Sequence, residues 1–273
     1  ATFNYDVCMN EACYQILAMD VQGLHRRAER SLEPFVRLQG TQGLDGGFRS
    51  KEGVFHGLSV EGHNYQGFRY NLDHGFVLWT LGEHGLLSGD ENWMKRNAGA
   101  IVDGCDFIIR ERKAAREAPG GDRPGIAGLV PPGHLEDVAE WHRWFAVNSY
   151  FPLGLKRAGE ALNAFGHPRS MGILTEARAY RADIARAAAF ARERSPAVRL
   201  RDGTAVPLTP SRADLRGREV GWIREQLYGS IHLILGEVLP PLSMEAGWIV
   251  QDFEDNLFLK PEYGRQADLP EYW

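Results

Sequence analysis

The sequence predicts an all-α fold in which helical hairpins stack into an α/α toroid, with one short β-hairpin near 199–208. Two observations carry this prediction. Apolar residues recur at a spacing of three or four along most of the chain, which is the period of an amphipathic helix. Long connections rich in glycine, proline and aromatic residues alternate with short ones, so the helices group into hairpins. In such a toroid the long connections gather at one rim and build a cleft.

The helices are expected in pairs. From the N-terminus they cover residues 6–19 and 21–38, 71–87 and 91–114, 138–164 and 170–194, and then 226–238 and 243–251. The stretch 39–67 is too polar and too rich in glycine for a helix, and 116–133 is a Pro/Gly loop. The segment VRLRDGTAVPL alternates in polarity around Asp202-Gly203, which predicts the β-hairpin.

Length and composition favour a single domain. The chain has 273 residues, 44% of them hydrophobic, so we expect one toroid domain over 1–273 with a sizeable core. Its first residues, ATFNYDVCMNEACYQ, lack an initiator Met, and we interpret the chain as the C-terminal or catalytic part of a longer protein. The three cysteines are interpreted as small buried apolar residues.

Charge and hydropathy exclude two classes of partner. The net charge is -5, and no block rich in Lys or Arg stands out, which argues against nucleic acid and anionic membranes. No apolar run approaches the roughly 20 residues that span a bilayer, and no signal-peptide pattern opens the chain. We therefore expect a soluble protein.

The segment Gly128–Tyr150, GLVPPGHLEDVAEWHRWFAVNSY, is the richest in chemically useful side chains. It starts in the Pro/Gly loop and continues into an expected helix. An aromatic ring offers a flat apolar face to a pyranose, and a carboxyl group can deliver a proton to a glycosidic oxygen. The alternative is a helix start with acidic residues at its positive end and tryptophans in the core. The candidates are Glu136, Asp137, Trp141, His142 and Asn148.

The expected second helix pair carries a resemblance to a known superfamily. Its sequence, NLDHGFVLWTLGEHGLLSGDENWMKRNAGAIVDGCDFIIRERK, resembles a hairpin of the six-hairpin glycosidases, which are (α/α)6 toroids. The later segment NSYFPLGLKRAGEALNAFG looks like the next inner helix, and the resemblance spans roughly 10–195. Two features depart from it: eight or nine expected helices in place of twelve, and the hairpin near 200–207. The resemblance therefore implies a complete or a partial (α/α)6 barrel.

This resemblance implies a carbohydrate-active enzyme whose substrate is an oligo- or polysaccharide. A glycoside hydrolase with carboxylates as acid and base is the first expectation. Some toroid relatives are polysaccharide lyases that use Tyr and His, so a lyase is the second. A non-catalytic carbohydrate-binding toroid is the third. The resemblance does not identify the catalytic carboxylates.

The residues themselves suggest which carboxylates act. Glu136 and Asp137 are adjacent and cannot straddle a sugar, so one of them needs a distant partner. We expect Asp137 to be the general acid and Glu136 to bind substrate. The partner is expected in the acidic segment SMEAGWIVQDFEDNLFLKPEYG, as Asp255 before Glu245, acting as base. The alternative for this segment is a solvated acidic face.

A third group lies in GWIREQLYGSIHL. Glu225, Tyr228 and His232 fall at i, i+3 and i+7 and share one face if this segment is a helix. Together with Trp222 they are expected to bind substrate, and Tyr228 and His232 would also fit a lyase. The alternative is a buried histidine with its hydrogen-bond partners.

The last candidates flank the Gly-rich stretch: Tyr65, Tyr70 and His74 are expected to face substrate, although Asp73 and His74 fit a helix cap equally well. No cofactor is expected, because the sequence has no GxGxxG and no Walker loop. No metal is expected either, because HExxH, an Asp-rich calcium loop and a Cys pair are all missing. His84 follows His74 by ten residues, which is not a ligand spacing.

Overall fold

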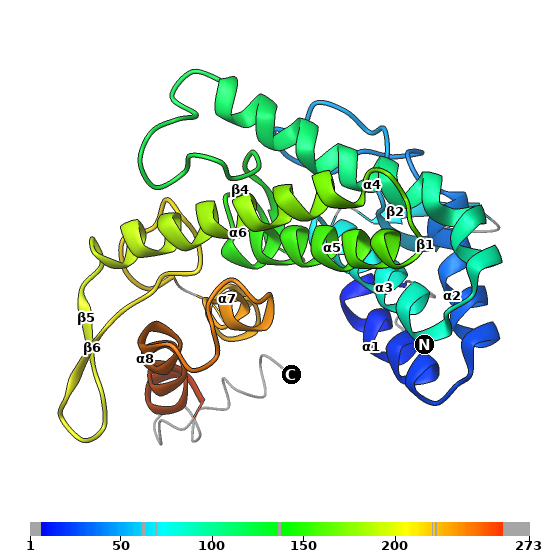
Figure 1. The fold of residues 1–273 in the computed structure, drawn as a ribbon. Helices are drawn as coiled ribbons and strands as arrows, with labels where there is room; N and C mark the ends of the chain where they lie inside the picture. Colours follow the sequence, from blue (N-terminus) through cyan, green and yellow to red (C-terminus); the bar gives the residue numbers. More distant parts are fainter. Residues whose placement is uncertain are drawn as a thin grey trace.

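The computed structural model is mostly helical, as predicted, and it describes residues 7–61, 64–68, 70–135, 138–219, 221 and 223–258. The α-helices are α1 (Met9–Val21), α2 (His25–Arg37), α3 (Leu72–Ser88), α4 (Glu91–Glu117), α5 (Phe145–Ala164), α6 (Ser170–Arg192), α7 (His232–Leu235) and α8 (Met244–Asp252) (Figure 1). Two π-helical segments, η2 (Ile223–Leu227) and η3 (Phe253–Phe258), complete the helical elements. None of the described helices has both the length and the apolar character needed to cross a membrane.

The helices pack in a regular order. The odd-numbered helices α1, α3, α5 and α7 lie side by side in chain order. Each of α2, α4 and α6 packs against odd-numbered helices that neighbour it in the chain. Figure 1 shows α5 and α6 crossing the middle of the molecule, with α4 along one side and α1 and α2 at one end. α3 and α5 are buried along most of their length, so the core lies along this central pair.

Glycines let α3 and α5 approach closely. A Cβ atom at Gly75 would lie 2.7 Å from the carbonyl of Tyr150, and one at Gly82 would lie 2.4 Å from the carbonyl carbon of Arg157. Beside this crossing, the rings of Phe76 and Tyr150 stack with their centroids 4.0 Å apart. Close packing of apolar atoms therefore stabilises the centre of the fold.

The start of α1 is fixed by a residue of α3. The backbone N–H groups of Met9 and Asn10 donate to Oδ1 of Asp73 over 2.8 and 3.2 Å. The residue at the N-cap position, Cys8, makes no side-chain cap of its own. Such first-turn N–H groups have no partner within a helix, so Asp73 acts as a cap supplied from elsewhere in the chain. Burial raises the pKa of Asp73 to about 7.

The strands form three antiparallel hairpins. They pair β1 (Gly57–Glu61) with β2 (Asn64–Phe68), β3 (Gly133–Leu135) with β4 (Val138–His142), and β5 (Ala197–Arg199) with β6 (Ala205–Pro207). The predicted hairpin around Asp202-Gly203 is confirmed as β5–β6. The expectation of one hairpin is wrong, because the Gly-rich stretch and the Gly128–Tyr150 segment each contain another.

The helix predicted over 138–164 begins later than expected. Residues of β4 pair with β3, with Val138 opposite Leu135 and His142 opposite Gly133. Trp144 is still extended, with φ -64° and ψ 131°, and α5 starts at Phe145. Strand pairing between β3 and β4 has replaced the first turns of the predicted helix. The acidic pair 136–137 therefore precedes a strand in the chain, not a helix.

The prediction of a continuous helix over 226–238 is wrong. The chain forms the π-helical η2 and then, after a break at 228–231, the single-turn α7. Gly229 lies at the break, where a Cβ atom would be 2.1 Å from the carbonyl oxygen of Glu225. Glu225 therefore does not share a regular helix face with Tyr228 and His232.

The long connections between the hairpins meet one another. Gly46 forms an isolated bridge with Gly133, which joins the α2–α3 connection to the α4–α5 connection. Trp144 bridges Arg212 in the same way, and the N–H of Phe145 donates to the carbonyl of Ser211 over 2.9 Å. The two loops predicted to share one rim, 39–70 and 116–137, are in contact through these described residues. The rim brings polar side chains from distant parts of the chain together.

Candidate functional site

Charged side chains from three parts of the chain form a continuous group at this rim. Its members come from β4, from the connection before α7, and from α8. We call it the arginine–carboxylate cluster, and it consists of Glu140, His142, Arg212, Arg218, Glu219, Arg224, Glu225 and Asp252.

Glu225 is the buried carboxyl group of the cluster. It is 5% exposed, and its Oε1 accepts the backbone N–H of Glu219 over 2.6 Å. Its Oε2 faces the guanidinium of Arg218 at 3.4 Å. Burial raises the pKa of Glu225 to about 7, because loss of hydration outweighs the backbone hydrogen bond and the attraction to Arg218. The side chain therefore exchanges a proton near neutral pH.

Arg218 joins Glu225 to the end of α8. Its Nη2 donates to both carboxylate oxygens of Asp252 over 2.7 and 2.9 Å, and Asn256 donates to the same carboxylate over 2.8 Å. The sequence prediction named Asp255 and Glu245 from this region. The acidic residue that meets Glu225 through one guanidinium is instead Asp252.

Asp255 and Glu245 have other partners. The carboxylate of Asp255 accepts the backbone N–H of Arg201, in the β5–β6 turn, over 2.8 Å. Glu245 lies in the first turn of α8 at 3.9 Å from Arg192. Neither is in contact with the cluster through a described interaction.

The second half of the cluster is built on β4. Arg224 donates to both carboxylate oxygens of Glu140 over 2.8–3.1 Å, and this hydrogen bonding lowers the pKa of Glu140. Arg212 donates to Glu219 over 2.6 Å and approaches Nδ1 of His142 at 2.9 Å. Between these contacts on β4, Trp141 is 55% exposed. Trp141 is thus an open aromatic side chain that neighbours Glu140 and His142 along the strand.

His142 is half-buried and neutral in this arrangement. Because an arginine can only donate, Nδ1 of His142 accepts the hydrogen bond from Arg212. Burial and then the charge of Arg212 lower the pKa of His142. Its ring meets Trp144 edge to face at 5.1 Å. Of the residues predicted to bind substrate, Trp141, His142 and Glu225 are those that the described structure places at the rim.

Tyr228 and His232 form a separate buried group that reaches α1. Their rings stack at 5.5 Å, and the Nδ2 of Asn10 donates to the Tyr228 hydroxyl over 2.6 Å. His232 Nδ1 is 2.8 Å from the Tyr150 hydroxyl, and its Nε2 is 2.7 Å from the carbonyl of Leu227. Burial lowers the pKa of His232 to about 4, so its ring is neutral at physiological pH.

His74 and Asn148 hold the scaffold together and are not open to a substrate. His74 Nδ1 accepts the N–H of Phe55 over 3.0 Å, and its Nε2 donates to the carbonyl of Gly104 over 3.1 Å. Burial lowers the pKa of His74 to about 3. Asn148 is equally buried, with Oδ1 accepting from Tyr180 and Nδ2 donating to Trp144. Both were predicted to bind substrate, and the polar atoms of both are used within the protein.

The structure describes only some of the remaining residues that were predicted to bind substrate or act in catalysis. Tyr70 is half-buried, with its ring 6.0 Å from that of His134. Of Tyr65 the structure describes the backbone alone, in β2. Glu136, Asp137 and Trp222 lie outside the described residues. The roles predicted for these three stay predictions.

A cavity lies apart from the cluster. It has a volume of about 240 Å³ and opens between α5, α6 and residues 236–237. Lys156 and Glu237 form an ion pair at its edge. Trp141 and His142 do not line it, so the predicted aromatic cleft is not this cavity.

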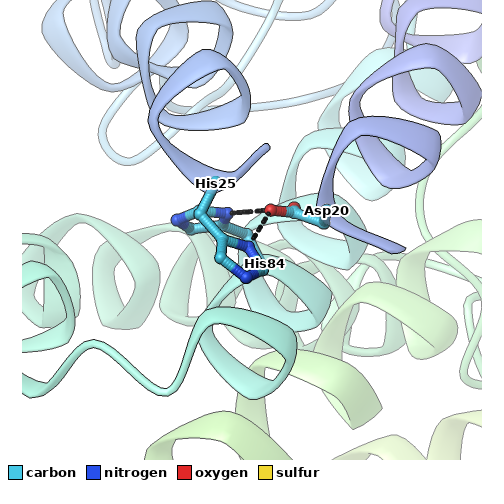
Figure 2. A group of neighbouring side chains, drawn as sticks. All are labelled: Asp20, His25 and His84. Atoms are coloured by element: carbon cyan, nitrogen blue, oxygen red, sulfur yellow. Dashed lines mark hydrogen bonds and ion pairs between the residues drawn. The ribbon is translucent and has the colours of Figure 1, made fainter. Parts of the chain in front are cut away.

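Sequence reasoning missed two sets of residues. Arg218 and Asp252 were not selected, although RGRE before an expected helix and the QDFEDN segment supply the charges that meet at Glu225. The second set is Asp20, His25 and His84, whose side chains converge at the other end of the molecule (Figure 2). Its signal is the Asp-x4-His spacing across the turn between the first two expected helices.

Comparison with protein-family models, with curated proteins and with solved structures finds no match to this chain.

Proposed function

We propose that the chain is a glycoside hydrolase built on an open, partial α/α toroid. The row of α1, α3, α5 and α7, with the even-numbered helices packed against it, is the order that a toroid of helical hairpins requires. The contacts between the long connections place polar side chains at one end of this row. A substrate cleft at that rim is the location that this architecture favours.

The raised pKa of Glu225 is the single observation that carries the proposal. The side chain is 5% exposed and bonded to Glu219 and Arg218, so the acid reaches a substrate only when Arg218 moves away from it. A glycosidase needs a carboxyl group that is still protonated at working pH, and catalysis is best when the pKa lies near that pH. Burial raises the pKa of Glu225 to about 7. The same effect makes a buried carboxyl group the acid in other glycosidases, while a more solvated one stays ionised.

Trp141 supports a sugar as the substrate. It is exposed on β4 between Glu140 and His142, whose side chains contact Arg224 and Arg212. An exposed indole provides a flat apolar face for a pyranose. Asp137, predicted as the acid, precedes β4 in the sequence by one residue. Glu225 and Asp137 are therefore the two proton donors to test.

A polysaccharide lyase is the second candidate, and one observation favours it. The hydroxyl of Tyr228 accepts a hydrogen bond from Asn10, and its ring stacks on neutral His232. In a lyase a tyrosine removes the proton next to the carboxylate of a uronic acid, while an amide or imidazole offsets the developing charge. Asn10, Tyr228 and His232 are the residue types for these roles.

One experiment separates the two reactions. The purified chain is incubated with neutral and uronate-containing polysaccharides, and products are followed by mass spectrometry and ultraviolet absorbance. A hydrolase adds water to each cleaved bond, whereas a lyase leaves an absorbing unsaturated uronate. We expect hydrolysis, with kcat/KM falling as the pH rises through 7 and Glu225 loses its proton.

Variants then assign the proton donor. Glu225→Gln or Asp137→Asn should lower kcat by about 10²–10⁴-fold, the usual contribution of a general acid. Glu160→Gln is the matched control, because Glu160 is half-buried and also paired with an arginine, at 2.8 Å from Arg157, but lies away from the cluster. Full activity of both acid variants on a cleaved glycan would exclude this mechanism. An unsaturated product that disappears in Tyr228→Phe would establish the lyase, and binding without cleavage would favour a carbohydrate-binding module.

A further inference from the structure

Three potential metal ligands meet where α1, α2 and α3 come together. Asp20 lies in the last turn of α1, His25 is the first residue of α2, and His84 is near the end of α3. The turn between α1 and α2 is short, and Gly23 takes a φ of 74° that lets the chain reverse. Figure 2 shows both imidazole rings directed at the carboxylate of Asp20.

The donor atoms are close and mostly shielded from water. Nδ1 of His25 lies 2.9 Å from Oδ1 of Asp20, and Nδ1 of His84 lies 2.9 Å from both carboxylate oxygens. The side chains of Asp20 and His84 are fully buried, while that of His25 is 33% exposed. The three donor atoms all lie within 4.8 Å of one another.

The charge of Asp20 calls for a cation. A buried carboxylate is costly unless a positive charge compensates it, and the negative end of the α1 dipole adds to that cost. Among the described residues, the ion-pair partners of Asp20 are the two histidines, with no lysine or arginine among them. Two neutral imidazoles would leave one negative charge buried in the protein.

We propose that Asp20, His25 and His84 bind a divalent transition-metal ion, for which Zn²⁺ is the probe. Two imidazole nitrogens and one carboxylate oxygen form a donor set suited to zinc and its neighbours, and not to calcium or magnesium. Ligand atoms about 2.1 Å from one tetrahedral ion are about 3.4 Å apart, so the hydrogen-bonded groups need to move apart by about 0.5 Å to admit the ion. The separations of 2.9 Å between Asp20 and each histidine are those of direct hydrogen bonds, which the ion would replace.

The surroundings define what kind of site this is. Three protein ligands leave coordination positions for water, and the partial exposure of His25 gives the ion a way in. The ring of His84 meets Trp93 edge to face at 4.4 Å, and its buried Nε2 has no hydrogen-bond partner among the described residues. Packing against Trp93 therefore orients this ring, whereas in other zinc sites a hydrogen bond to the second ring nitrogen does so. A bound ion would tie three helices together.

Zinc binding to the chelator-treated chain tests the proposal. We expect one Zn²⁺ per chain by equilibrium dialysis with elemental analysis, and a rise in the midpoint of thermal unfolding, since an ion that binds the folded state stabilises it. Co²⁺ in place of Zn²⁺ should give visible absorption bands that report nitrogen ligands.

The decisive variant is His25→Ala, because this side chain is the most exposed of the three. It should weaken Zn²⁺ binding by at least about tenfold and remove the thermal shift. The control is His167→Ala, which removes another half-buried histidine before a helix, bonded to the N–H of Arg169. If His25→Ala unfolds, His25→Gln, which keeps a side chain of similar reach, replaces it.

Two results would overturn the proposal. One is a wild-type chain that binds no more Zn²⁺ than His25→Ala. The other is a His25 variant that is less stable than the wild type in the presence of chelator, while added zinc changes the stability of neither protein. That result would make the three residues a hydrogen-bonded network without a metal.

Discussion

The centre of the fold and the rim are stabilised by different forces. α3 and α5 meet through glycines and stacked rings, with backbone against backbone at Gly75 and Gly82. The segment from Arg212 to Leu235 contains a π-helix and a four-residue helix, and its charged side chains connect it to β4 and α8. Apolar contact depends little on pH, whereas buried carboxylates depend on it strongly. The centre sets the shape and includes the buried titratable groups Asp73 and His74 of α3, and the rim carries the arginine–carboxylate cluster.

The largest expected effect comes from filling the helix crossing. Gly82→Ala places a Cβ atom 2.4 Å from the carbonyl carbon of Arg157, so α3 and α5 must move apart. We expect a loss of about 3–4 kcal/mol in the free energy of unfolding, measured by urea denaturation. Gly99→Ala is the control, because Gly99 is exposed within α4 with no atom within 4 Å, and it should gain about 0.5–1 kcal/mol. Equal effects of the two variants would disprove the tight crossing.

The pH dependence of stability should come from two buried carboxyl groups, Asp73 in α3 and Glu225 at the rim, each of which has a pKa raised to about 7. The pKa of Glu225 rises from 4.5 to about 7 on folding, so the folded state holds a proton that the unfolded state has lost. This stabilisation is complete below pH 4.5 and disappears as the pH rises to 7. One pKa unit corresponds to about 1.4 kcal/mol, so Glu225→Gln should remove a decline of about 3 kcal/mol over this range.

Denaturation curves at several pH values measure the difference in the free energy of unfolding between the wild type and Glu225→Gln. Glu160→Gln should keep the wild-type pH profile. His232 works in the opposite direction, because its pKa falls on folding and stability from this residue rises as the pH passes from about 4 to 6.5. If wild type and Glu225→Gln have parallel profiles, the carboxyl group is not protonated near neutral pH.

The smallest effects are expected from the ion pairs of the rim, where the buried pairs of Arg218 should contribute more than the exposed pair of Arg224 and Glu140. Arg218→Met leaves Glu225 and Asp252 without their shared cation, and we expect a loss of about 2 kcal/mol because Arg218 is still partly hydrated. Arg224→Met removes a pair whose Glu140 side chain is 54% exposed, and it should cost less than about 1 kcal/mol. Thermal unfolding of both variants in low and high salt checks this order, and a larger loss in Arg224→Met would reverse it.

Local pattern predicted the long helices and failed at the rim. α4 and α6 follow an apolar spacing of three to four over many turns, and Asp202-Gly203 is a strong turn signal, so these elements were found. In β4 the sequence VAEWH suits a strand or a helix, and pairing with β3 decides between them. The break at Gly229 depends on a close approach of its backbone to the carbonyl of Glu225, and a single glycine in a helical pattern does not by itself predict such a break.

The sequence indicated which types of residue would form the candidate site, but it did not indicate which residues would contact one another. Glu225 and His142 stood out as unusual polar residues among apolar ones, and both reach the rim. Their partners Arg218 and Arg212 come from a connection without periodicity, so nothing local linked them. Asp20 and His84 are 64 positions apart, and the helix packing alone brings them together. Tertiary contacts between charged groups of this kind leave no repeat in a sequence.

The cap that Asp73 provides for α1 has a consequence for synthesis of the chain. The hydrogen bond joins Met9 to a residue 64 positions later. A helix of 13 residues is marginal by itself in water, and its first N–H groups have no other cap from Cys8. When α1 leaves the ribosome, the residue that fixes its first turn has not yet been made. α1 therefore stays marginal in the nascent chain until α3 has emerged, and Asp73 then supplies the cap that fixes its first turn.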